Sequence, residues 1–117
     1  MKKINAAIIG SGYGYYVIYK AIKRLNNIST IYVYGRSLKK IKSIFKDKKI
    51  IFYNSWKKML VENEINLLAI ATIPTLQTEI LLSKEIKKKK IDFFFVEKPL
   101  AENYEKAKKI FSLYKDK

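Results

Sequence analysis

The chain has 117 residues, the length of one domain, and 49% of them are hydrophobic, which is enough for a packed core. It contains no cysteine and no histidine, which excludes disulfides, structural zinc sites, cysteine nucleophiles and histidine acid/base catalysis, and we expect no metal site. The net charge is +15, which by itself suggests a nucleic-acid partner. Only two of the 25 basic residues are arginines, however, and base-reading proteins favour arginine, so this composition argues against a nucleic-acid partner.

Apolar runs and amphipathic segments alternate along the chain. In chain order, they predict a strand at 4–9, a helix at 15–25, a strand at 29–34, a helix at 38–45, a strand at 49–53, a helix at 56–61, a strand at 66–72, a helix at 74–90, a strand at 91–96 and a helix at 103–114. Ser37 and either Asn54 or Ser55 suit N-cap positions, and Pro74 suits a helix start. Short linkers between such elements indicate parallel, right-handed βαβ units. We therefore predict an α/β fold, a Rossmann-like doubly wound parallel sheet of five strands and five helices, with no second domain.

The first predicted strand and helix are joined by Gly10-Ser11-Gly12-Tyr13-Gly14-Tyr15. In a dinucleotide-binding loop the first glycine makes the tight turn, the second admits the pyrophosphate, and the helix N-terminus offers free N–H groups. Here Tyr15 stands at the third glycine position, with Gly14 one residue early. Glycine turns also join strands to helices in folds that bind no nucleotide, but the flanking elements favour a cofactor site at residues 10–14.

The second predicted strand ends in Tyr34-Gly35-Arg36-Ser37, where an NAD-binding fold has a carboxylate for the ribose hydroxyls. Arginine suits the 2′-phosphate of NADP instead, and Ser37 can donate a further hydrogen bond. The alternative is a solvated arginine in a turn. We predict NADP as the cofactor, with NAD still possible.

The fifth predicted strand leads into Glu97-Lys98-Pro99-Leu100-Ala101. Ligands bind at the carboxyl ends of strands in open parallel sheets, and in a cleft Lys98 could hold substrate or donate a proton. The alternative is an exposed ion pair of little energetic value. The preceding lysines, Lys87 to Lys90, lie at the predicted end of a helix, where they complement its dipole.

Apolar runs such as 6–9 and 91–96 are too short to cross a membrane, and the apolar stretch after Met1-Lys2-Lys3 is too short for a signal peptide. We therefore expect a cytoplasmic protein. Phe93, Phe94 and Phe95 lie on the last strand of the predicted sheet and are expected to leave an apolar surface there. Such a surface favours a homo-oligomer or a partner chain.

The glycine loop, the segment Ala69-Ile70-Ala71-Thr72-Ile73-Pro74 and the segment Glu97 to Ala101 together resemble the N-terminal domain of Gfo/Idh/MocA oxidoreductases. The resemblance runs from about residue 3 to residue 110. It implies one NAD(P)-binding Rossmann domain over residues 1–117, with Thr72, Pro74, Glu97 and Lys98 at the cofactor. It also implies that Lys98 lies near the nicotinamide and substrate, as the catalytic residue. The chain departs from the family at Ile73, where proline is common, and at Gln77 and near Ile18, where histidine is frequent.

Members of this family carry a second domain that supplies most substrate contacts and usually a histidine acid/base. The resemblance therefore implies a dinucleotide-binding domain that works with a separate chain carrying a substrate domain, or a shortened remnant of an oxidoreductase. Whether the chain is an enzyme by itself stays open. A stand-alone nucleotide-sensing regulatory module is the main alternative, and a basic nucleic-acid-binding protein is a weaker one.

Overall fold

The computed structural model describes residues 3–10, 13–35, 50–97, 101 and 103–114. Their strands form one five-stranded sheet in the order β3-β2-β1-β4-β5, and every pairing is parallel. The strands are β1 (Ile4–Gly10), β2 (Ile28–Tyr34), β3 (Ile50–Tyr53), β4 (Leu67–Ala71) and β5 (Phe93–Val96). The helices are α1 (Tyr13–Lys23), α3 (Trp56–Glu62), α4 (Pro74–Leu81), α5 (Lys84–Lys87) and α6 (Tyr104–Tyr114). The predicted Rossmann-like parallel sheet is confirmed, while the predicted helix at 38–45 lies outside the described residues.

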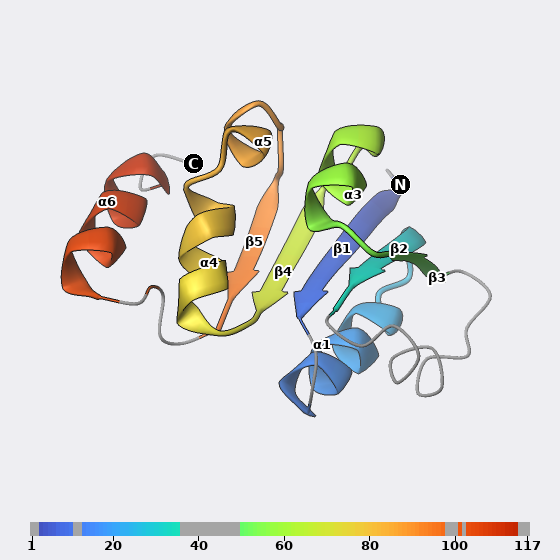
Figure 1. Cartoon of the computed structure of the whole chain (residues 1–117). Helices are drawn as coiled ribbons and strands as arrows, with labels where there is room; N and C mark the ends of the chain where they lie inside the picture. The colour runs from blue at the N-terminus through green and yellow to red at the C-terminus, as the bar shows by residue number, and fades with distance from the viewer. Residues whose placement is uncertain (1–2, 11–12, 36–49, 98–100, 102, 115–117) are drawn as a thin grey trace.

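Helices cover the sheet on both faces (Figure 1). α1 packs on one face, where its buried side chains Ile18, Tyr19 and Ile22 join the strands in one apolar cluster. α3, α4, α5 and α6 lie on the opposite face, over a second and larger cluster. A sheet covered on both sides needs strands that are apolar at successive positions rather than at alternate ones.

β1 shows this requirement directly. Ala6 and Ile8 belong to the cluster beneath α1, whereas Ala7 and Ile9 belong to the cluster on the other face, and all four are fully buried. Side chains alternate between the two faces of a strand, so the continuous apolar run serves both cores. β4 is divided in the same way, as expected for an interior strand, and β1 is the middle strand of the sheet.

The helix starts follow local capping chemistry. The Ser55 side chain accepts a hydrogen bond from the backbone N–H of Lys58 at 3.3 Å, which confirms it as the N-cap of α3. Pro74 stands in the first turn of α4, as predicted, where its missing N–H costs no hydrogen bond. At α6, Asn103 accepts a hydrogen bond from the backbone N–H of Lys106 at 2.9 Å.

The prediction of one helix over residues 74–90 is wrong, because the structure has two helices there. α4 ends at Leu81, and Ser83 begins α5. The Ser83 hydroxyl donates to the carbonyl of Ile80 at 2.6 Å and accepts from the backbone N–H of Ile86 at 3.4 Å. This side chain therefore closes one helix and opens the next.

The strand predicted at 91–96 begins later than expected. The backbone N–H groups of Asp92 and Phe93 both donate to the carbonyl of Asn66, at 2.9 Å each. The chain turns at this point, so β5 begins at Phe93 and pairs in register with β4 from Leu67 onward.

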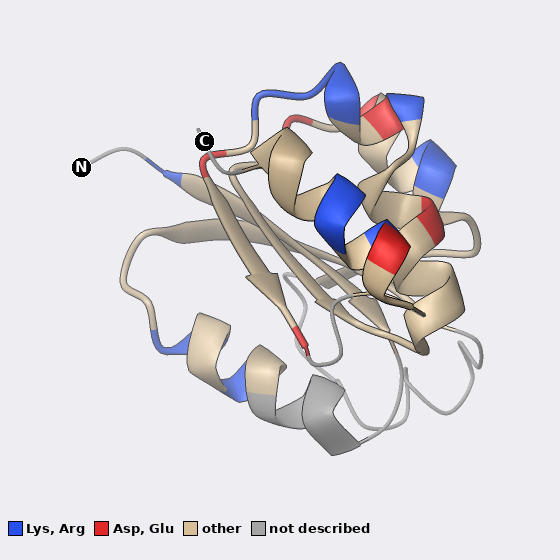
Figure 2. Ribbon diagram, turned by 90° about the vertical axis from the view of Figure 1, so that its left-hand side faces the viewer, with Lys and Arg blue, Asp and Glu red and all other residues tan. Residues whose placement is uncertain are grey.

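Most of the lysines that the structure describes lie on or beside the helices that cover the larger core, and nearly all of these are exposed (Figure 2). Lys89 differs, because its ammonium donates to the carbonyl of Asn63 at 2.6 Å and so ties the segment after α5 to the end of α3. No helix formed by the described residues is both long enough and apolar enough to span a lipid bilayer.

α6 is attached to the sheet through Tyr114. Its hydroxyl donates to the carbonyl of Leu81 at 2.7 Å, and its ring contacts Phe94 edge-on, with 5.1 Å between ring centroids. Burial raises the pKa of Tyr114 from 10.0 to about 12. The folded pKa of Tyr114 lies above the unfolded one, so the folded state favours the neutral hydroxyl. The stability that depends on this neutral hydroxyl is complete below pH 10 and is lost as the pH rises through 12.

We expect Tyr114→Phe to lower the free energy of unfolding at neutral pH by about 1 kcal/mol, through loss of the hydrogen bond to Leu81. The variant should also lose less stability than the wild type as the pH rises above about 10. Urea unfolding at neutral and alkaline pH measures both effects. Tyr104→Phe, at an exposed tyrosine of the same helix, is the control and should behave as the wild type. Identical alkaline slopes for Tyr114→Phe and the wild type would contradict the prediction.

Candidate cofactor-binding site

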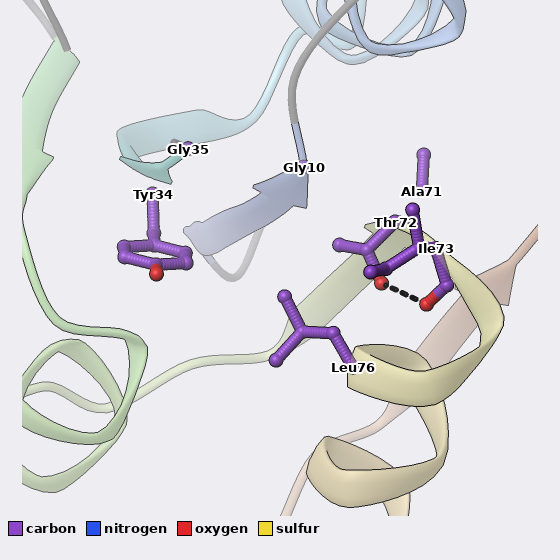
Figure 3. Close-up of a pocket in the computed structure, with 7 residues that line it drawn as sticks. All are labelled: Gly10, Tyr34, Gly35, Ala71, Thr72, Ile73 and Leu76. Carbon is purple, nitrogen blue, oxygen red and sulfur yellow. Dashed lines mark hydrogen bonds between the residues drawn. The ribbon is translucent and has the colours of Figure 1, made fainter. Parts of the chain in front are cut away.

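A cavity of about 300 Å³ opens at the carboxyl ends of β1, β2 and β4. Its lining residues, drawn in Figure 3, are Gly10, Tyr34, Gly35, Ala71, Thr72, Ile73 and Leu76. The chain runs from β1 outward to β2 and β3, then returns to β4 on the other side of β1. The cavity therefore lies at the point where the strand order reverses, which is where open parallel sheets bind their ligands.

Gly10 lines the cavity at the carboxyl end of β1. It is the last residue of β1, lies beside Ala71 of β4, and has a φ of 150°, which glycine adopts without strain. α1 begins three residues later, at Tyr13, and has no acidic residue in its first turn. Its first backbone N–H groups have no intrahelical partners, so this end of the helix can bind an anion.

Two walls of the cavity are apolar. Tyr34, at the end of β2, presents its ring on one side, and Leu76 of α4 points toward the cavity from the other (Figure 3). Ile73 precedes Pro74 at the start of α4 and is about half exposed. A space between an aromatic ring and aliphatic side chains suits a flat, weakly polar group.

The polar groups of the cavity are few. Thr72 follows β4 and donates a hydrogen bond from its hydroxyl to the carbonyl of Ile73 at 3.1 Å. Within the described part of the chain, no Asp or Glu lines the cavity. Gly35, buried at the end of β2, leaves space where a side chain would otherwise stand.

Glu97 lies at the same edge of the sheet, after β5. Its backbone N–H donates to the carbonyl of Ile70 at 3.0 Å, and its own carbonyl accepts a hydrogen bond from the side-chain amide of Gln77 at 2.8 Å. Its carboxylate side chain is exposed and does not line the cavity.

The predicted site residues fall into three groups. Gly10 and Thr72 lie together in the cavity. Pro74 and Glu97 lie at the same edge of the sheet but outside the lining, and Tyr13 and Gly14 form the start of α1. The others lie outside the described residues: Ser11, Gly12, Arg36, Ser37 and Lys98.

Sequence reasoning did not identify Tyr34 and Leu76 as lining residues. Tyr34 looks like an ordinary strand residue, and Leu76 looks like a core position of a helix. The usable signal is position, because each lies at the carboxyl-terminal edge of the sheet, Tyr34 ending β2 and Leu76 in the first turn of α4.

The family model described as an oxidoreductase family with an NAD-binding Rossmann fold, Gfo/Idh/MocA, matches residues 4–117. The chain belongs to the Gfo/Idh/MocA oxidoreductase family. The resemblance seen in the glycine loop and the Glu-Lys-Pro segment is thereby confirmed, and the chain corresponds to the NAD-binding Rossmann domain of these oxidoreductases. Comparison with curated protein sequences finds no match.

Solved structures of the same fold include complexes with cofactor. The chain is similar to a biliverdin reductase from Synechocystis sp. PCC 6803, in complex with biliverdin and NADP⁺, with a TM-score of 0.80 and 23% identity over 97% of this chain and 35% of that one. It is also similar to a myo-inositol dehydrogenase from Lactobacillus casei, in complex with NAD(H) and myo-inositol, with a TM-score of 0.81 and 20% identity over 98% of this chain and 34% of that one. The Gfo/Idh/MocA chain described here thus spans about a third of the length of these proteins.

Proposed function

We propose that this Gfo/Idh/MocA domain binds NADP(H), with NAD(H) as the weaker ligand, and serves as the cofactor-binding part of an oxidoreductase. The observation that carries the proposal is the cavity at the strand reversal, which is lined by Gly10 and has no acidic lining residue among those described. Next to the buried Gly35, the sequence places Arg36 and Ser37, residue types that suit a 2′-phosphate.

In this proposal, each part of the cofactor takes one side of the cavity. The pyrophosphate belongs at the loop between β1 and α1, at residues 10–14. The adenosine half then extends toward β2, between Tyr34 and Leu76, and the nicotinamide half extends toward β4 and β5. Thr72, Pro74, Glu97 and Lys98 belong to that second side. When bound, the cofactor supplies or accepts a hydride, and we assign the accompanying proton transfer to Lys98.

Titration of the purified chain with NADPH and with NADH, followed by nicotinamide fluorescence, tests this proposal. We expect saturable binding of both, with NADPH bound more tightly because only NADPH carries the 2′-phosphate. Affinity should be micromolar or weaker, since nothing in the described residues encloses the cofactor from above. A chain that binds neither NADPH nor NADH would refute the proposed function.

We further propose that the substrate-binding part of the oxidoreductase, carried by a separate chain, contacts β5. Phe93 and Phe95 are 59% and 50% exposed on the α1 side of the sheet, while Phe94 packs against Tyr114. β5 pairs with β4 on one side and, within the described residues, with no strand on the other. About two thirds of the length of the similar structures has no counterpart in this chain, and this surface is available to such a part.

In the absence of that partner, we expect the same surface to cause self-association. Light scattering at high concentration should show dimers or larger species, and Phe93→Ser combined with Phe95→Ser should shift them toward monomer. Phe111→Ser, at an exposed phenylalanine of α6, is the matched control and should leave the association unchanged. A wild-type chain that stays monomeric at high concentration would count against an interface at β5.

A further inference from the structure

Gln77 is a polar side chain in an apolar setting. It lies in α4, is 0% exposed, and follows Leu76, which lines the cavity. The neighbouring buried side chains of α4, Ile80 and Leu81, belong to the larger apolar core. Burying an amide group is costly unless hydrogen bonds replace those it made with water.

The hydrogen bond from Gln77 fixes one particular peptide. Its side-chain Nε2 donates to the carbonyl of Glu97 at 2.8 Å, and the N–H of Glu97 donates to the carbonyl of Ile70 at 3.0 Å. Glu97 is therefore held from two sides, by the sheet through its N–H and by α4 through its carbonyl. β5 itself ends at Val96, so these two bonds determine where the chain leaves the sheet.

We propose that Gln77 is a positioning residue for the nicotinamide half of the cofactor, acting through the Glu97 peptide. This inference rests on the proposed function, in which that half extends toward β4 and β5 and Lys98 follows Glu97 in the sequence. In this proposal, residues of α4 act on both halves of the cofactor. Leu76 forms a wall of the adenosine side, and Gln77, the next residue, holds the segment on the other side.

This arrangement separates a positioning role from a purely structural one. Replacing Gln77 with methionine, an apolar side chain of similar length, removes the donor without opening a large cavity. If the glutamine only filled the core, such a change would alter the free energy of unfolding and leave the ratio of the affinities for the two ligands unchanged. If it positions Glu97, the change weakens NADP⁺ more than a ligand that lacks the nicotinamide half.

The experiment compares NADP⁺ with 2′,5′-ADP, which carries the adenosine, the 2′-phosphate and a 5′-phosphate but no nicotinamide half. We expect Gln77→Met to lower the affinity for NADP⁺ about tenfold relative to 2′,5′-ADP, as measured by calorimetry. The control is Thr78→Val, because Thr78 is also buried on α4 and its hydroxyl donates to Pro74 at 2.8 Å, within the same helix. This control should keep the wild-type ratio of affinities.

A second variant, Gln77→Glu, keeps the inference testable if the methionine variant does not fold. A glutamate at this position can donate to the Glu97 carbonyl only while it is protonated. The ratio of NADP⁺ to 2′,5′-ADP affinity in Gln77→Glu should therefore fall, relative to the wild-type ratio at the same pH, as the pH rises from about 5 to about 8. The titration of the 2′-phosphate cancels because both ligands carry it, and comparison with the wild type at each pH removes the effect of the 5′-phosphate of 2′,5′-ADP, which titrates at about pH 6.

The outcomes distinguish the two proposals. A wild-type chain that binds neither ligand overturns the proposed function. A wild-type chain that binds both, with the wild-type ratio retained in Gln77→Met and, at each pH, in Gln77→Glu, overturns the positioning role alone.

Discussion

Gly10→Val is expected to lower the affinity for NADP(H) by at least about 100-fold, which corresponds to about 2.7 kcal/mol. Gly10 has a φ of 150°, where a β-branched residue is strained, and it lines the cavity at the point where the pyrophosphate must approach the backbone. The branched side chain would both distort the end of β1 and occupy the space that the ligand needs. Calorimetric titration with NADP⁺ measures the loss.

The same substitution should also lower the free energy of unfolding, by about 1–3 kcal/mol of backbone strain. A loss of binding through partial unfolding must therefore be separated from a loss of the site. Ile65→Val provides the comparison, because Ile65 is 1% exposed, lies just before β4 at the opposite edge of the sheet, and should cost about 0.5–1.5 kcal/mol. It should leave the affinity unchanged. Wild-type affinity in Gly10→Val would show that the pyrophosphate does not bind beside β1.

The parallel sheet was predictable because its central strands are apolar at successive positions. In β1 the run Ala6 to Ile9 contributes to both apolar clusters. A short continuous apolar run that ends at a glycine turn is typical of a strand buried on both faces. The edges were less predictable. β5 begins at Phe93 rather than Ile91 because Asn66 accepts two backbone hydrogen bonds at the turn, a tertiary contact that no local pattern encodes.

The division between α4 and α5 was missed for a related reason. Leu81, Leu82 and Ile86 continue the helical spacing, so periodicity alone indicates one helix over residues 74–90. The two hydrogen bonds of the Ser83 hydroxyl compete with the continuous helix at this residue. They end α4 and start α5, although the spacing of the apolar residues does not change. A serine in the middle of an amphipathic segment is the only sequence sign of it.

The candidate site divides in the same way. Gly10 was predictable as a residue of the cavity from the glycine loop that follows the first predicted strand, and Thr72 from the resemblance to the family. Tyr34 and Leu76 were not predicted to line the cavity, because each matches the pattern of an ordinary strand or helix residue, and Gln77 was noted only as a departure from the family. The positions of Tyr34 and Leu76 beside the cavity depend on which strand ends lie side by side, and that order is a property of the folded sheet.

Arg36→Asp is expected to change the ratio of NADP(H) to NAD(H) affinity by about 100-fold or more, from a preference for NADP(H) to a preference for NAD(H). On the proposed function, the change removes the charge-assisted hydrogen bonds that Arg36 would make to the 2′-phosphate, worth roughly 1.5–3 kcal/mol, and it introduces a carboxylate that repels the phosphate. The same carboxylate can accept hydrogen bonds from the ribose hydroxyls of NAD(H). Fluorescence titration with NADPH and NADH, at one fixed salt concentration, gives the ratio before and after the change.

The other arginine of the chain provides a matched control. Arg24 is exposed and follows α1 at the end remote from the cavity, so Arg24→Asp makes the same change in net charge without altering the predicted phosphate site. A highly basic domain attracts the more negative ligand from a distance, and both variants should weaken that general attraction slightly. Only Arg36→Asp should reverse the preference, because the proposal puts only this residue beside the ribose. Equal affinities for NADPH and NADH in the wild type that persist in Arg36→Asp would show that residue 36 does not choose the cofactor.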